Sequence, residues 1–149
     1  MTASNFEQML KRSAAEVLES MCFVSVCENL ESPAFFDPHW IAVKLHFAGQ
    51  SSGDFGICSP LSTSRTLASN FLGEEDADMT DAKAMEVLCE LSNMMCGSFL
   101  SEMAGESVFD LSHPESDPAP TAEKTASQSL QLDEGHLYVW MNLEAAHEC

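Results

Sequence analysis

The alternation of hydrophobic and polar positions divides the chain into helical and extended segments. Apolar residues recur every three or four positions in three stretches, which predicts helices over residues 4–21, 60–72 and 82–103. Shorter β-favouring or alternating runs predict strands over residues 23–27, 40–48, 54–58, 107–111, 129–132 and 137–143. Because the connections between strands are short, we expect an α+β fold, a largely antiparallel sheet with packed helices. A helix followed by three strands occurs twice, so we expect two α-β-β-β halves.

Local signals mark the ends of these segments. Ser4 and Glu7 form a capping box that opens the first helix, while Pro60 is expected at the first position of the second helix. Gly73 is expected to end that second helix as a C-cap. The chain between elements is predicted to form a hairpin loop over residues 49–53, an irregular connection over 113–122 and a tight turn over 133–135. The acidic run over residues 74–78 complements the dipole at the start of the next helix.

The longest predicted helix, residues 82–103, has two distinct faces. Its wide apolar face is expected to form the core and contains Ala84, Met85, Leu88, Leu91, Met95, Cys96, Phe99 and Met103. A narrow stripe on another face, spaced i, i+4, i+7 and i+11, contains Glu86, Glu90, Asn93 and Gly97. Two carboxylates, a carboxamide and a glycine in one line make this stripe the candidate site. Val87 and Met94 flank the stripe, and the pattern leaves open whether they face a partner or the core.

Composition and charge narrow the classes of partner. The chain has 149 residues, which is enough for a single domain spanning 1–149 with a sizeable core. Its 24 acidic and 6 basic residues give a net charge of −18. Nucleic acids and anionic membranes bind to basic patches, so we expect neither as a partner. The acidity either keeps the protein in solution or attracts a basic partner, and both interpretations stay open.

Cysteine, histidine and tryptophan are expected to have structural roles. The six cysteines include no CxxC pair and the five histidines are scattered, so we expect no bound metal. Cys89 and Cys96 lie on or beside the apolar face of the long helix and are expected to pack as small hydrophobic residues. Trp40 and Trp140 lie on predicted strands as packing residues. With no secretion signal and no apolar run of about 18 residues, we expect a soluble, reduced, cytoplasmic protein.

The order of elements and one motif on the long helix carry a family resemblance. The motif is Glu90-Leu91-Ser92-Asn93, followed by Gly97, on a helix preceded by a loop. Over nearly the whole chain this arrangement resembles the CheC/CheX/FliY family of response-regulator phosphatases, and the CheX branch most closely. CheC-type members carry a second such motif on the first helix; Glu16-Val17-Leu18-Glu19 has no Asn, so the resemblance implies a single site.

This resemblance implies a phosphatase that hydrolyses the aspartyl phosphate of a CheY-like response regulator. Glu90 would pair with the receiver's lysine, Asn93 would orient the attacking water, and Gly97 would leave room for the docked partner. The chain would need no cofactor of its own, since Mg²⁺ would come with the phosphorylated receiver. The branch also implies a homodimer that pairs through its sheets.

Two departures from the family pattern leave alternatives open. Glu86 stands where the family usually has Asp or Ser, and it could extend the docking contact or repel the phosphoryl group. Pro114 and Pro118 bracket the position where the family tends to have a proline. One alternative is a non-catalytic module that sequesters a receiver domain or joins a flagellar or signalling assembly. Another is a domain that binds a small ligand on the same fold.

Overall fold

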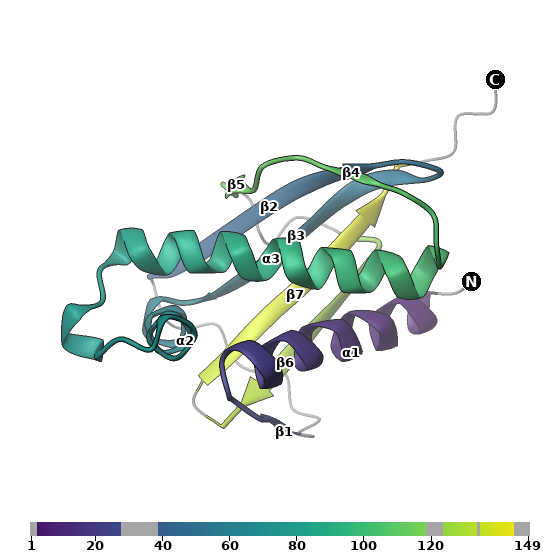
Figure 1. Ribbon diagram of the computed structural model, residues 1–149. Coiled ribbons are helices and arrows are strands. Elements are labelled where there is room, and N and C mark those ends of the chain that lie inside the picture. The colour runs from purple at the N-terminus through teal and green to yellow at the C-terminus, as the bar shows by residue number, and fades with distance from the viewer. Residues whose placement is uncertain (1–2, 28–38, 119–123, 134, 145–149) are drawn as a thin grey trace.

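The helices cover one face of an antiparallel sheet (Figure 1). The computed structural model describes residues 3–27, 39–118, 124–133 and 135–144. Within these residues the helices are α1 (Ala3–Met21), α2 (Leu61–Leu72), the 3-10 turn η1 (Asp76–Asp78) and α3 (Asp81–Ala104). The strands are β1 (Val26–Cys27), β2 (Trp40–Ala48), β3 (Ser52–Pro60), β4 (Asp110–Leu111), β5 (Glu115–Ser116), β6 (Ala126–Leu132) and β7 (Gly135–Leu143). None of the described helices is both long and apolar enough to cross a membrane.

The strand order shows an internal two-fold relation. The sheet runs β1-β6-β7-β3-β2-β4, with β5 also paired to β2, and every pairing is antiparallel. Exchanging β1 with β4, β2 with β6 and β3 with β7 gives the same order in reverse. The predicted α+β fold with two α-β-β-β halves is therefore confirmed. The outermost strand of each half pairs with the other half, so the halves are interlocked.

Each long helix also packs on a strand of the other half. α1 packs on β6, α3 packs on β2, and the two helices contact each other. Phe99 of α3 lies at the centre of this layer, with its ring centroid 6.2 Å from that of Phe6 and 5.9 Å from that of Phe55. Near the C-terminal end of α3, the guanidinium of Arg12 on α1 donates to the Glu102 carboxylate. The core therefore holds α3 by one full side.

The helix predictions hold, with small changes at the ends. α3 extends the predicted 82–103 by one residue at each end. α2 ends at Gly73, whose φ of 68° is the left-handed conformation of a C-cap glycine. Pro60 is not the first residue of α2 as expected; it ends β3, paired with Trp40, and directly precedes the helix. Ser4 was expected to cap α1, but α1 begins at Ala3.

Two of the predicted strands are shorter in the structure, and one observed strand was not predicted. In place of a strand over 23–27, only β1 forms, because the Leu18 carbonyl accepts the N–H groups of both Cys22 and Val24. This tight turn places Phe23 at φ 58°, with its side chain 77% exposed. The strand over 107–111 shrinks to β4, and β5 lies in the connection predicted as irregular. Positions 119–122 of that connection lie outside the described residues.

Pairing on both sides lengthens the inner strands. β3 lies between β2 and β7 and extends through Ser52 and Gly53, which were expected in the hairpin loop. β6 lies between β1 and β7 and begins at Ala126, three residues before the predicted start. Each added residue gains backbone hydrogen bonds to a neighbouring strand, which the one-dimensional hydrophobic pattern does not register.

A tryptophan packs on the face of the sheet opposite the helices. Trp140 on β7 is 2% exposed, and its indole lies across Gly56 of β3. Lys124 covers the other side of the ring, with Nζ 3.6 Å from the ring centroid. Burial lowers the pKa of Lys124, while the charge of Asp117 acts in the opposite direction. Trp140 is therefore a packing residue, as predicted, and Trp40 stacks edge-on against His136.

We expect Gly56→Ala to destabilise the protein strongly. A Cβ at this position would overlap the Trp140 ring, and such overpacking typically costs about 1–3 kcal/mol. Urea unfolding followed by circular dichroism measures the loss. An unchanged unfolding midpoint would mean that Trp140 does not pack on β3 as described.

Three buried thiols make stability fall at alkaline pH. Burial raises the pKa of Cys22, Cys58 and Cys96 from 9.0 to about 12. Between these values the unfolded chain has lost thiol protons that the folded chain keeps. The free energy of unfolding therefore declines as pH rises from about 9 towards 12. We expect Cys58→Ala to show a shallower decline than the parent in urea titrations at several pH values; parallel declines would contradict the burial of this thiol.

Candidate functional site

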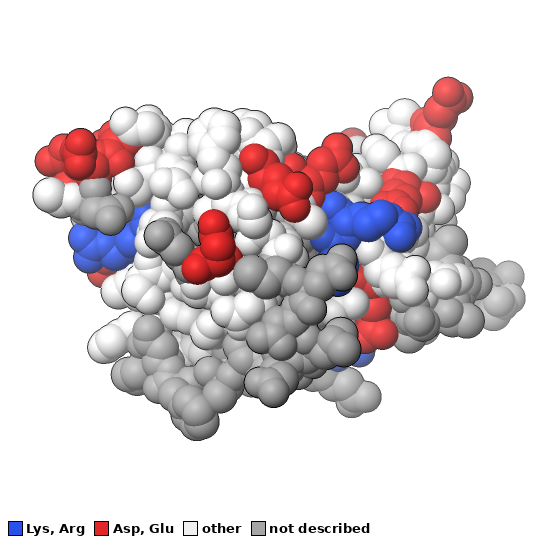
Figure 2. Space-filling view, turned by 90° about the horizontal axis from the view of Figure 1, so that it is seen from below, with Lys and Arg blue, Asp and Glu red and all other residues white. Residues whose placement is uncertain are grey.

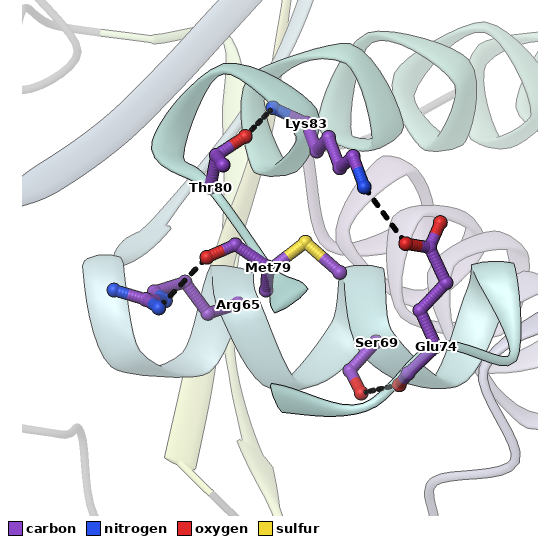
Figure 3. Close-up of polar contacts among 6 residues, drawn as sticks. All are labelled: Arg65, Ser69, Glu74, Met79, Thr80 and Lys83. Carbon is purple, nitrogen blue, oxygen red and sulfur yellow. Dashed lines mark hydrogen bonds and ion pairs between the residues drawn. The ribbon is translucent and has the colours of Figure 1, made fainter. Parts of the chain in front are cut away.

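The candidate site lies on α3, whose start is held firmly against α2. The Thr80 hydroxyl caps the helix by accepting the Lys83 N–H at 3.1 Å. Lys83 Nζ in turn donates to Glu74 Oε1 at 2.8 Å, and Arg65 donates to the Met79 carbonyl at 2.9 Å. Figure 3 shows how these contacts tie α2 and the first turn of α3 to the segment that connects them. The α2–α3 connection therefore positions α3 from its first residue.

The Glu74–Lys83 pair also settles the role of the acidic run over residues 74–78. A hydrogen bond from Lys83 to Glu74 and the charge of that carboxylate are the main causes that raise the Lys83 pKa, and the charge of Asp78 adds to them. Residues 76–78 form η1, so the run is an ordered joint between α2 and α3, and its Glu74 carboxylate contacts Lys83 in the first turn of α3. We expected it to complement the helix dipole; its best-defined contact is with a side chain instead.

The predicted stripe lies on the outer side of α3. Glu86 and Glu90 are exposed, and Asn93 and Gly97 are partly exposed. The side chains of Glu86, Glu90 and Asn93 make no hydrogen bond or ion pair with another described residue. Along the helix axis Glu90 and Asn93 are separated by about 4.5 Å. One turn of helix therefore presents a carboxylate and a carboxamide side by side, with their polar atoms available to a partner.

Gly97 leaves a gap at the end of the stripe. A Cβ built at this position meets no other atom within 4 Å. The glycine is therefore not required by packing inside the chain, unlike Gly56. Glycine inside a helix lowers the stability of the helix relative to alanine. No contact within the fold explains why glycine occupies position 97.

A proline forms one margin of the stripe. Pro114, in the segment between β4 and β5, is buried, and its carbonyl oxygen lies 3.9 Å from the Cys89 sulfur. Burial raises the pKa of Cys89, and the charges of Glu90 and Glu86 raise it further. The thiol therefore lies close enough to both carboxylates to be affected by their charge. Of the two prolines that bracket the family position, Pro114 is the one that contacts α3; the sequence could not distinguish them.

The opposite margin is apolar. Val87 is 3% exposed and belongs to the core, which answers one of the questions left open by the sequence. Met94 packs partly against the core and keeps part of its surface outside. Cys96 is buried as predicted, whereas Cys89 is only half-buried. The stripe is thus a polar line between a proline-bearing segment and a methionine.

The chemistry of these side chains limits what the site can do. Among the described residues, no three His, Cys, Asp or Glu side chains gather closely enough to hold a metal ion. Asn93 is neutral and can donate or accept a hydrogen bond, but it cannot attack an electrophile or take a proton at neutral pH. Glu90 offers a negative charge to a cation. Together they suit the orientation of a water molecule and the docking of a basic group supplied by another molecule.

Comparison with known proteins decides the family. The sequence profile of "Chemotaxis phosphatase CheX" matches residues 41–138, about two thirds of the chain. The chain belongs to this family. No curated protein sequence matches it.

Solved structures agree with this fold. The chain is similar to chemotaxis protein CheX from Desulfovibrio desulfuricans, with 15% identity and a TM-score of 0.70, covering 94% of this chain and 99% of that one. It is similar to CheX from Vibrio vulnificus, with 16% identity and a TM-score of 0.70, covering 97% and 99%. It is also similar to CheX in a CheX–CheY–BeF3–Mg²⁺ complex from Borrelia burgdorferi, with 22% identity and a TM-score of 0.62, covering 92% and 96%.

The gap at Gly97 yields a stability prediction for this CheX-family chain. We expect Gly97→Ala to raise the free energy of unfolding by about 0.5–1 kcal/mol, because alanine is the better helix former and its methyl group meets no atom. Urea unfolding checks this, with Gly56→Ala as the contrasting glycine. A loss of stability in Gly97→Ala would show that the position is crowded in solution.

Proposed function

We propose that this chain accelerates hydrolysis of the aspartyl phosphate on a CheY-like receiver domain. The observation that carries the proposal is the pairing of Glu90 and Asn93 on the outer side of a helix whose other side is in the core. Membership of the chemotaxis phosphatase CheX family supports the reaction class. The similar Borrelia burgdorferi protein was solved with CheY, which supports the class of partner.

In the proposed mechanism, water attacks the phosphorus in line with the leaving aspartate. A bond forms between the water oxygen and phosphorus, the bond from phosphorus to the aspartyl oxygen breaks, and the products are a free carboxylate and inorganic phosphate. Both protons of the water stay with the phosphate, which leaves as dihydrogen phosphate, because Asn93 cannot accept a proton. Asn93 holds the water in line by hydrogen bonds, which removes part of the entropic barrier. Mg²⁺ held by the receiver would neutralise the phosphoryl oxygens, and we propose that this chain contributes no metal of its own.

Glu90 supplies the docking contact in this proposal. Its carboxylate pairs with the receiver's lysine and so fixes the depth at which Asn93 enters the phosphorylation site. Because α3 is packed firmly in the core, the two side chains stay one turn apart. The space left by the missing side chain at Gly97 accommodates the receiver's backbone. We also propose that the chain forms a homodimer, as its family resemblance implies.

A second candidate is a non-catalytic module that binds a receiver without stimulating it. Glu86 favours this candidate, because it replaces the usual Asp or Ser and adds a second exposed carboxylate to the docking stripe. The two candidates share the partner and differ in turnover. Phosphate release from phosphorylated receivers therefore separates them.

We expect the wild-type chain to accelerate loss of phosphate from a cognate receiver, and Asn93→Ala to reduce that acceleration by about 100-fold while binding is retained. Glu90→Ala should weaken binding to the receiver by about 10-fold or more, since the receiver's lysine loses its partner. Ser101→Ala, an exposed change on the same helix, serves as the control. Acceleration that survives Asn93→Ala would overturn the mechanism, and binding without acceleration in the wild type would favour the non-catalytic module.

A further inference from the structure

Glu86 is an exposed carboxylate whose charge is not neutralised within the described structure. It lies one turn before Glu90, so two like charges sit about 6 Å apart on one stripe, an arrangement that mildly destabilises a helix. No ion pair joins either carboxylate to a basic side chain of the described residues. The stripe therefore presents a double negative charge outward.

Acidic side chains also occur elsewhere on the surface. In the face shown in Figure 2, acidic side chains lie in several separate groups, and the basic side chains lie beside some of them. Acidity is thus dispersed on that face and does not mark a docking surface by itself. The significance of Glu86 depends instead on its own neighbours.

The nearest cation in sequence is held away from Glu86. Lys83 is three residues earlier on α3, a spacing at which side chains on a helix can pair. Its ammonium group is instead 2.8 Å from Glu74, on the side of the helix toward α2 (Figure 3). Arg65 on α2 donates to the Met79 carbonyl, and its guanidinium lies 3.8 Å from the Asp81 carboxylate. The contacts of the joint between α2 and α3 thus engage Lys83 and Arg65 away from the stripe.

Position along the helix decides between the two roles left open for Glu86. It precedes Asn93 by seven residues, which is about 10.5 Å of helix axis. Two unit charges about 10 Å apart in bulk water alter a rate about twofold, and physiological salt reduces this further. At the same interface, repulsion of a phosphoryl group held at Asn93 is weaker per charge than a direct contact of Glu86 with a cation, because the separation is larger. A cation in direct contact with Glu86 at a partly desolvated interface has a larger effect.

We infer that Glu86 is a specificity-determining residue that pairs with a second basic side chain on the receiver, one helical turn beyond the lysine that Glu90 meets. The Glu74–Lys83 ion pair is a positioning contact that keeps Lys83 from occupying that place. This inference rests on the proposed function. It selects, among receivers with the same phosphorylation chemistry, those that carry Arg or Lys at the matching position outside the phosphorylation site.

The first test measures binding of the full chain to a receiver activated with beryllium fluoride and Mg²⁺. We expect Glu86→Gln to weaken binding about 10-fold and to lower the dependence of affinity on salt concentration. Glu106→Gln removes an exposed charge beyond the other end of α3, and it should leave both quantities unchanged. Equal affinity and equal salt dependence in wild type and Glu86→Gln would overturn the inference.

The second test releases Lys83 without touching the stripe. We expect Glu74→Gln to weaken receiver binding about threefold to tenfold, because Lys83 then pairs with Glu86. The double variant Glu74→Gln/Lys83→Met should return to within about twofold of wild type. If the Glu74–Lys83 pair has a purely structural role, removing Lys83 will not restore receiver binding. That result would overturn the positioning role.

These results separate failure of the inference from failure of the proposed function. If wild type neither binds nor stimulates any receiver tested, the proposed function is wrong. If wild type stimulates a receiver and Glu86→Gln behaves identically, only the inference is wrong. Reversal provides the positive control: Glu86→Lys should abolish binding to the native receiver and regain it with a receiver whose docking Arg or Lys is changed to Glu.

Discussion

The burial of one full side of α3 is the constraint on which the rest of the structure depends. The helix packs against α1, α2 and the sheet, and its inner residues, among them Leu88, Leu91 and Met95, are completely buried. Interiors packed this closely resist rotation of a helix, because turning it by one residue would bring a carboxylate into the core. The outer stripe is therefore fixed in direction by residues that never reach the surface. The packing of the core therefore determines where the side chains of the outer stripe lie.

The sequence predicted the parts of the fold that repeat along the chain. The 3.6-residue period located α3 to within one residue at each end, and the same period brought Glu90 and Asn93 together on the outer face. It predicted strands that include β1 and β4 but made them too long, and it missed β5, because these two-residue strands depend on the pairing that β6 or β2 supplies. It also could not show that Pro114 contacts Cys89 or that Lys83 turns toward Glu74. Those contacts join segments whose relative placement no local pattern encodes.

The family assignment and the chain's own residues answer different questions. The family profile identifies the class of protein, while solved structures of 15–22% identity show that the fold is shared. Neither specifies what Glu86 does, since it departs from the usual Asp or Ser. Its surroundings in this chain are Glu90 one turn away, Lys83 paired with Glu74, and the partly exposed Met94 at the apolar margin of the stripe. On these grounds we infer that Glu86 affects the choice of partner and leaves the reaction unchanged.

The interlocked halves also govern how the chain must fold. Val26 pairs with Leu132, more than 100 residues away in sequence, and α1 packs on β6 near the other end of the described chain. Closing so long a loop costs entropy before any core contact repays it, so contacts of this kind slow folding. Neither half can bury its long helix without the strands of the other. During synthesis the first half must therefore wait, with apolar surface exposed, until β6 and β7 have left the ribosome.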